Sequence, residues 1–316
     1  GASKSLTDVT LYFQKCNDFG DHGVTGLAQG MPAFKSLTRF CLHVMDCNTI
    51  GDVGVTALAQ ALGALTSLTY VHFAFWSCTH IGDAGAAALA QSLGALKSLG
   101  FLYLRLNGCS IGDAGAAAVG QELGASKSVT SMRLYFQECN DVGDAGLTGL
   151  AQGLAALTSL TKVQLEFRTL DKVSDAGVTA VAQGLGASKS LTDVTLYFEQ
   201  CCNFGDAGMT GLGQALGMTS LTDVHVGLLK CCNFGDTGLT GLGEGLGASK
   251  SLAKVHLEFP GYVFGDAAVT GLAQGLGALK SLANAELLLD HKKFSARGRD
   301  EVIRVLAKMV KYGAGH

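Results

Sequence analysis

Cysteine is the residue type with the widest chemistry in this chain, because thiols can form disulfides, bind metals or act as nucleophiles. Ten cysteines occur among the 316 residues. Seven of them recur about every 31 residues, with one interval doubled: Cys16, Cys47, Cys78, Cys109, Cys139, Cys201 and Cys231. Such regular spacing indicates one repeated structural position rather than a disulfide framework.

Two further cysteines, Cys202 and Cys232, each follow a member of that series directly. If they face each other outside the core, they could form a disulfide, or the two Cys-Cys pairs could hold a metal ion. Tetrahedral thiolate sites usually come with Cys-x-x-Cys spacing, which weighs against the metal. The sequence leaves open whether Cys202 and Cys232 pair.

His225 and His256 stand the same interval apart as the cysteines. If each interval holds one strand, the two rings stack at about the 4.8 Å spacing of neighbouring strands. Two imidazoles can bind a transition metal, but no carboxylate or thiol shares their position in the repeat. We therefore interpret them as two exposed histidines on a sheet face and predict no metal site.

Two glycine-containing motifs could be mistaken for nucleotide-binding loops. In GASKS, serine stands where a phosphate-binding loop needs glycine before lysine, and the motif falls between helix and strand, which is the wrong order. GLGEGLG at residues 241–247 has the composition of the surrounding helix. No nucleophile and base are confined to one unit, so we expect a protein that is not an enzyme and needs no cofactor.

The elements that position these residues form a repeat. The segment GASKSLTDVTLYF opens the chain and recurs letter for letter at residues 186–198. A fixed period of this length is the signature of a stacked repeat array. Ten units align on a serine before each apolar core: Ser5, Ser36, Ser67, Ser98, Ser128, Ser159, Ser190, Ser220, Ser251 and Ser281. We expect one domain over residues 1–316, either as a segment of a longer array, which we favour, or with a partner covering its first unit.

The sequence pattern of each unit predicts a strand, a turn and a helix. Apolar and polar residues alternate from Val9 to Phe13, as in a strand with one buried face. After the turn CNDFGD, apolar residues recur at helical spacing from Val24 to Met31, with Asp21 at the expected N-cap. We interpret the nine repeated aspartates, Asp21 to Asp266, as caps of their own helices. Units of this size cannot bury an apolar face alone and must stack into a solenoid.

The segments LTDVTLYFQKCNDFGDHGVTGLAQGM and LGFLYLRLNGCSIGDAGAAAVGQEL resemble leucine-rich repeats of the ribonuclease-inhibitor-like class. The shared pattern is L-x-x-L-x-L, an Asn/Cys turn, and I/F-G-D-x-G-x-x-x-L-A. The resemblance implies an α/β solenoid shaped as a horseshoe, with a parallel β-sheet on the concave face and helices on the convex face. It also implies that the cysteine column points into the core. Buried thiols suit an intracellular, reducing compartment, with the cytoplasm favoured over an organelle.

The concave face is where we expect recognition, because its strand positions vary from unit to unit. Tryptophan, tyrosine and arginine, the residues enriched in interface hot spots, gather there on three consecutive units. We call this group the aromatic–arginine patch: Tyr70, His72, Trp76, Phe101, Tyr103, Arg105, Arg133 and Tyr135. The resemblance implies a protein–protein interaction scaffold that binds a partner protein through this face, on its own or as a subunit of a larger assembly.

Two other functions stay open at this stage. One is a GTPase-activating protein resembling the Ran GTPase-activating group, which shares this repeat class, although no loop arginine or asparagine is singled out for that role. The other is a purely architectural spacer. A GTPase-stimulation assay would separate the first from a scaffold.

Charge and hydropathy limit the other partners. The net charge of −3 does not decide for or against nucleic acid, and we predict no nucleic-acid partner. Residues 53–82 contain no charged side chain, but polar residues interrupt them in phase with the repeat, so we predict no membrane insertion. We expect a C-terminal capping helix at about residues 298–312. Basic residues concentrate in and before that helix and could form a docking surface: Lys292, Lys293, Arg297, Arg299, Arg304, Lys308 and Lys311.

Overall fold

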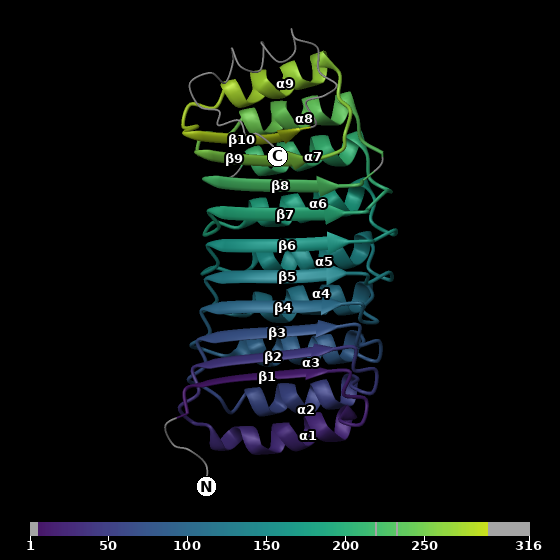
Figure 1. Cartoon of the computed structure of the whole chain (residues 1–316). Coiled ribbons are helices and arrows are strands. Elements are labelled where there is room, and N and C mark those ends of the chain that lie inside the picture. The colour runs from purple at the N-terminus through teal and green to yellow at the C-terminus, as the bar shows by residue number, and fades with distance from the viewer. Residues whose placement is uncertain (1–5, 219, 232, 290–316) are drawn as a thin grey trace.

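A computed structural model describes residues 6–218, 220–231 and 233–289. Within these residues the chain alternates strictly between strands and helices, as Figure 1 shows. The strands are β1 (Asp8–Gln14), β2 (Arg39–Met45), β3 (Tyr70–Trp76), β4 (Phe101–Asn107), β5 (Ser131–Gln137), β6 (Lys162–Arg168), β7 (Asp193–Glu199), β8 (Asp223–Leu229), β9 (Lys254–Phe259) and β10 (Asn284–Leu289). The helices are α1 (Gly20–Gly30), the 3-10 turn η1 (Met31–Ala33), α2 (Asp52–Leu62), α3 (Asp83–Ala95), α4 (Asp113–Gly124), α5 (Asp144–Ala155), α6 (Asp175–Ala187), α7 (Asp206–Gly217), α8 (Asp236–Gly247) and α9 (Asp266–Gly277).

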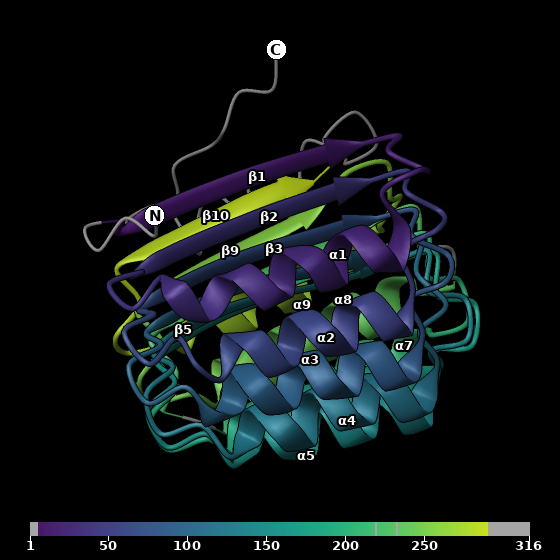
Figure 2. The ribbon, with the colours of Figure 1, turned by 90° about the horizontal axis from the view of Figure 1, so that it is seen from below.

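The strands form one parallel sheet in chain order, from β1 to β10. Equivalent residues of successive units lie side by side; Val9, for example, pairs in register with Phe40. Figure 2 shows the helices stepping outward from α1 to α5 and back toward α9, so the sheet lines the inner side of an arc. The expected α/β solenoid with a concave parallel sheet is confirmed.

The core lies between the sheet and the helices and runs along the stack. Alternate residues of each strand point into it, and the rings of Phe136, Phe167 and Phe198 follow one another at centroid distances of 6.3 and 5.2 Å. Strand and helix of one unit each show an apolar face that the neighbouring units complete. Burying one apolar side chain contributes about 1.5–3 kcal/mol to stability. An isolated unit would leave many of these side chains exposed to water, so it would not fold without its neighbours.

The repeated cysteines line this core, as the family resemblance implied. Six of the seven are buried; Cys16, in the first unit, is half-buried. Their thiols donate to strand carbonyls, as from Cys139 Sγ to the Leu106 oxygen at 3.0 Å. Burial raises the pKa of Cys78 to about 11 and that of Cys139 to about 12. These thiols therefore stay protonated near neutral pH and are poor nucleophiles.

The repeated aspartates do not cap their own helices, which corrects the sequence-based interpretation. From α2 onward the residue before each helix is a glycine, or Ser174 before α6, and the aspartate is the first helical residue. Its carboxylate reaches the following unit instead. Asp113 Oδ1 accepts hydrogen bonds from the backbone N–H groups of Gly143, at 2.7 Å, and Gly146, at 2.8 Å. The carboxylates from Asp21 to Asp236 thus each cap the helix of the next unit, where the helix dipole also favours negative charge.

This contact explains why the third helical residue, two positions after the aspartate, is a glycine in nearly every unit. A Cβ atom on Gly146 would lie 2.6 Å from Asp113 Oδ1, and one on Gly177 would lie 2.4 Å from Asp144 Oδ1. In α9 the equivalent residue is Ala268, whose N–H bonds to the Gly265 oxygen at 3.1 Å. There the aspartate contact runs from Gly265 N–H to Asp236 Oδ1, at 2.8 Å.

Several sequence-based predictions concern residues outside those that the structure describes. The capping helix at about 298–312, the basic segment within residues 292–311 and Cys232 all lie there. Of the described helices, none is both long and apolar enough to cross a membrane.

The inter-unit cap predicts a selective loss of stability. Asp113→Ala leaves two buried N–H groups at the start of α5 without their acceptor, so it should lower the free energy of unfolding by about 1–2 kcal/mol. Asp113→Asn, which keeps an oxygen acceptor, should cost less. Urea denaturation followed by circular dichroism measures both.

The matched control is Asp141→Ala, which removes the same side chain from an exposed ion pair with Lys172 at 2.6 Å. Exposed pairs contribute little, so its midpoint should stay close to that of the parent chain. Equal midpoint shifts for Asp113→Ala and Asp141→Ala would contradict the cap.

Candidate partner-binding site on the concave face

The structure brings the whole aromatic–arginine patch onto the concave side of β3, β4 and β5. The parallel register sets Tyr70 beside Phe101, and His72 beside Tyr103. It likewise sets Arg105 beside Tyr135 on the next strand. Trp76, at the end of β3, belongs to the same face because side chains alternate along a strand. The patch is therefore one continuous surface.

Ring stacking organises the patch. Tyr70 and Phe101 are stacked, with centroids 4.7 Å apart and planes 8° from parallel. His72 lies 3.9 Å from Tyr103, whose ring in turn lies 4.8 Å from that of Tyr135. Cross-strand aromatic pairs of this kind contribute roughly 0.2–1 kcal/mol each, so they hold the rings in fixed positions.

Arg105 is held by rings rather than by a carboxylate. Its guanidinium carbon lies 4.6 Å from the centroid of Tyr135 and 5.4 Å from that of Trp76. Its Nε is buried without a hydrogen-bond partner among the described residues. Cation–π contacts of this kind place a positive charge on an apolar platform.

Tyr135 differs from the expectation of an exposed contact residue. Only 4 % of its surface is accessible, because Tyr103 and Arg105 lie over it. Burial, and next the charge of Glu166, raises the pKa of its hydroxyl. Tyr135 is therefore the floor of the patch. Trp76, at 39 % exposure, and the exposed Arg133 are the members that a partner would meet first.

The line of rings extends further than the sequence indicated. Tyr12 stacks on His43 with a centroid distance of 4.5 Å, and His43 lies 4.6 Å from His72. The strand neighbour of His43 is Ala74, whose small side chain leaves room for this diagonal contact. A comparison of residues in register does not reveal the contact between His43 and His72, because His43 is in register with Ala74. The small side chain of Ala74 beside a ring is the sequence feature that indicates it.

Positive charge and burial keep the histidine of the patch neutral. The pKa of His72 is lowered from 6.5 to about 4, first by burial and then by His43, Arg105 and Arg133. The pKa of His43 is also lowered, by burial and by Arg105. At neutral pH the rings are uncharged, and the arginines carry the charge of this surface.

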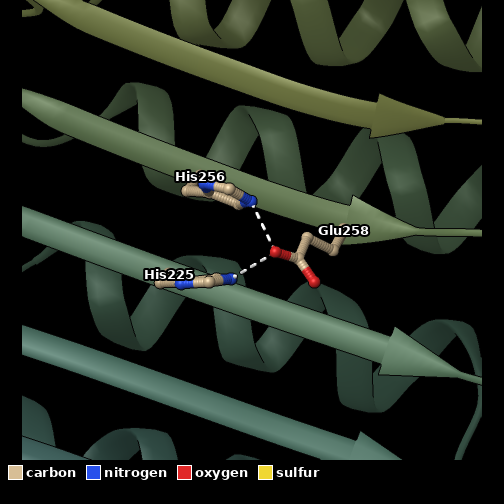
Figure 3. A group of neighbouring side chains, drawn as sticks. All are labelled: His225, His256 and Glu258. Carbon is tan, nitrogen blue, oxygen red and sulfur yellow. Dashed lines mark hydrogen bonds and ion pairs between the residues drawn. The ribbon is translucent and has the colours of Figure 1, made fainter. Parts of the chain in front are cut away.

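A second group of side chains lies on β8 and β9, away from the patch. His225 and His256 stack as expected, with centroids 4.0 Å apart. The expectation that no carboxylate shares their position in the repeat is wrong, because Glu286 pairs in register with His256 and its Oε2 lies 3.1 Å from His256 Nδ1. Glu258 Oε1 also lies 3.1 Å from His225 Nε2 and 2.7 Å from His256 Nε2 (Figure 3). Glu258 stands two residues beyond His256 and reaches back diagonally, so it occupies another position of the repeat.

Cys202 lies outside the column of core cysteines and is half-buried. Its sulfur donates to the Lys230 oxygen at 3.5 Å.

Two segments of the chain match the profile of a known repeat family. The profile of the leucine-rich repeat family matches residues 41–59 and 101–120. A search of curated proteins gave no match. Among solved structures, a chain of the crystal structure of the Rad7 and Elc1 complex in yeast is similar. It has a TM-score of 0.49 and 18% sequence identity, and the alignment covers 94% of this chain and 74% of that chain.

The electrostatics of His72 predict a pH dependence of stability. A histidine whose pKa is lowered by folding binds protons more readily when the chain is unfolded, so stability falls as pH drops from 6.5 toward about 4. His72→Gln removes this contribution, and its melting temperature should fall less between pH 7 and pH 5 than that of the parent chain.

The control is His22→Gln, which changes an exposed histidine on α1. It should lose as much melting temperature over the same pH interval as the parent does. If His72→Gln also loses as much as the parent, His72 is not a source of the acid sensitivity.

Proposed function

We propose that this chain, which is a leucine-rich-repeat protein, is a non-enzymatic scaffold that binds a partner protein through the aromatic–arginine patch. The patch lies on the concave side of a rigid parallel sheet. Sites built on strands hold their side chains more precisely than sites on loops, which lowers the entropy lost on binding.

The observation that carries the proposal is the exposed Trp76 beside Arg105, with a second arginine, Arg133, exposed on the same face two strands away. Tryptophan and arginine are the residue types most enriched in binding hot spots, and stacked neighbours already fix their positions. Arg105 and Arg133 lie over rings, 4.6 Å from Tyr135 and 6.0 Å from Phe101 respectively. The buried ring of Tyr135 thus fixes Arg105 in place, while Trp76 and Arg133 remain exposed. Such a hot spot is preorganised, since its side chains need not become ordered when a partner binds.

The chemistry of the patch indicates the kind of partner surface. Its rings offer flat apolar area, while its guanidinium groups offer donors for carboxylate or carbonyl oxygens. A partner segment that combines an acidic side chain with an apolar one fits both. We also propose that this chain is one subunit of a larger assembly and that it works in an intracellular, reducing compartment. The buried thiols of the core cysteine column support that compartment.

The test is a quantitative pull-down with the full chain and a double variant, Trp76→Ala with Arg133→Ala. Both side chains are exposed, so folding should survive their removal, and circular dichroism checks this. Loss of one or two hot spots costs about 2 kcal/mol or more, so recovery and affinity of the specific partner should fall more than about tenfold.

The matched control is Tyr12→Ala with Lys254→Ala, which removes an exposed ring and a cation from the ends of the same concave face. It should retain the partner. A protein captured equally by the parent and by both double variants is not bound through the patch, and that outcome would remove the proposal.

A further inference from the structure

His225, His256 and Glu258 direct three donor atoms toward one point of the concave face. The two Nε2 atoms lie 3.1 and 2.7 Å from the same carboxylate oxygen of Glu258 (Figure 3). The donor atoms of the three residues all lie within 4.8 Å of one another, and no other group of this kind occurs in the described part of the chain. The site lies on β8 and β9, so it is independent of the patch on β3–β5.

A second carboxylate orients the ring of His256. Its Nδ1 lies 3.1 Å from Glu286 Oε2. A carboxylate only accepts hydrogen bonds, so Nδ1 carries a proton, and Nε2 is the nitrogen of this ring that can bind a metal ion. Metal-binding histidines are commonly oriented in this way, with the other ring nitrogen donating to a carboxylate.

His256 Nε2 faces a carboxylate oxygen. This nitrogen is buried and makes no hydrogen bond within the described residues, although Glu258 Oε1 is 2.7 Å away. A contact this short requires positive charge on or between the two atoms, which either a proton on Nε2 or a metal ion in its place supplies. Metal coordination satisfies both atoms at once and displaces that proton.

The strands explain why these groups meet. His225 and His256 are in register, as are Gly227 and Glu258. A Cβ atom at Gly227 would lie 2.3 Å from the ring of Tyr197, so glycine makes room for that ring. The Tyr197 hydroxyl then lies 2.9 Å from His225 Nε2 on the side opposite β9. Because this is the nitrogen directed at Glu258, a metal ion bound there displaces the hydrogen bond to Tyr197.

We propose that His225, His256 and Glu258 bind a zinc ion, with Glu286 orienting His256. Two imidazoles and one carboxylate form a donor set that zinc uses with three protein ligands, which leaves coordination positions open. The two histidines line a hollow of about 400 Å³ on the concave face, together with Arg133, Lys254 and Asp223. An anionic group entering this hollow can complete the coordination.

The experiment is isothermal titration of the full chain with zinc chloride under a phosphine reductant, which keeps the cysteines reduced. The parent should bind one equivalent in a saturable step. Glu258→Gln and His256→Gln should each weaken binding at least about tenfold, and Glu286→Gln about tenfold, because even orienting partners carry that much affinity. The control His43→Gln removes an imidazole from the other histidine stack and should bind as the parent does.

Cobalt(II) tests the donor set on the unaltered chain, so the result does not depend on a variant that folds. Thiolate ligands give a strong near-ultraviolet charge-transfer band, whereas nitrogen and oxygen donors do not. The bound ion should lack this band. No saturable binding, a thiolate band, or equal affinity in Glu258→Gln, His256→Gln and the parent would each overturn the zinc site. None of these results bears on the aromatic–arginine patch.

Discussion

The contact between an aspartate of one unit and two backbone N–H groups of the next is the interaction on which the stack depends. The start of each helix has N–H groups without a partner inside that helix, and a buried donor left unpaired costs about 1–3 kcal/mol. Here the missing acceptor comes from about 30 residues earlier, as in the bonds of Gly51 and Gly54 to Asp21 Oδ1. Helix order, unit spacing and the requirement for glycine all follow from this arrangement.

Much of the fold could be predicted from the sequence, because a repeat multiplies weak signals. Alternation in each strand, helical spacing after each turn and the column of cysteines all pointed to a parallel solenoid. The aspartates were assigned wrongly because capping rules consider only the helix that a residue begins. An aspartate that caps the helix of the next unit occupies the same sequence position as one that caps its own helix, so the sequence does not distinguish the two. The informative signal was the glycine three residues into the helix, where a Cβ would meet that carboxylate.

The same limit applies to the two groups of side chains on the concave face. Register placed Tyr70 beside Phe101 and His225 beside His256, and both contacts are present. Diagonal contacts were missed: Arg105 reaches Trp76, and Glu258 reaches both histidines. Long side chains reach beyond the residue in register with them. Their contacts therefore depend on side-chain rotamers, which an alignment of the repeats does not give.

Amide hydrogen exchange of the intact chain tests the central claim most directly. Gly143 and Gly146 begin α5 and donate to Asp113, whereas Ala145 lies between them on the exposed side. Slow exchange at both glycines with fast exchange at Ala145 is the predicted result, repeated at the equivalent glycines along the stack. Exchange at Gly143 and Gly146 as fast as at Ala145 would show that the preceding unit does not hold the helix, and would contradict the claim.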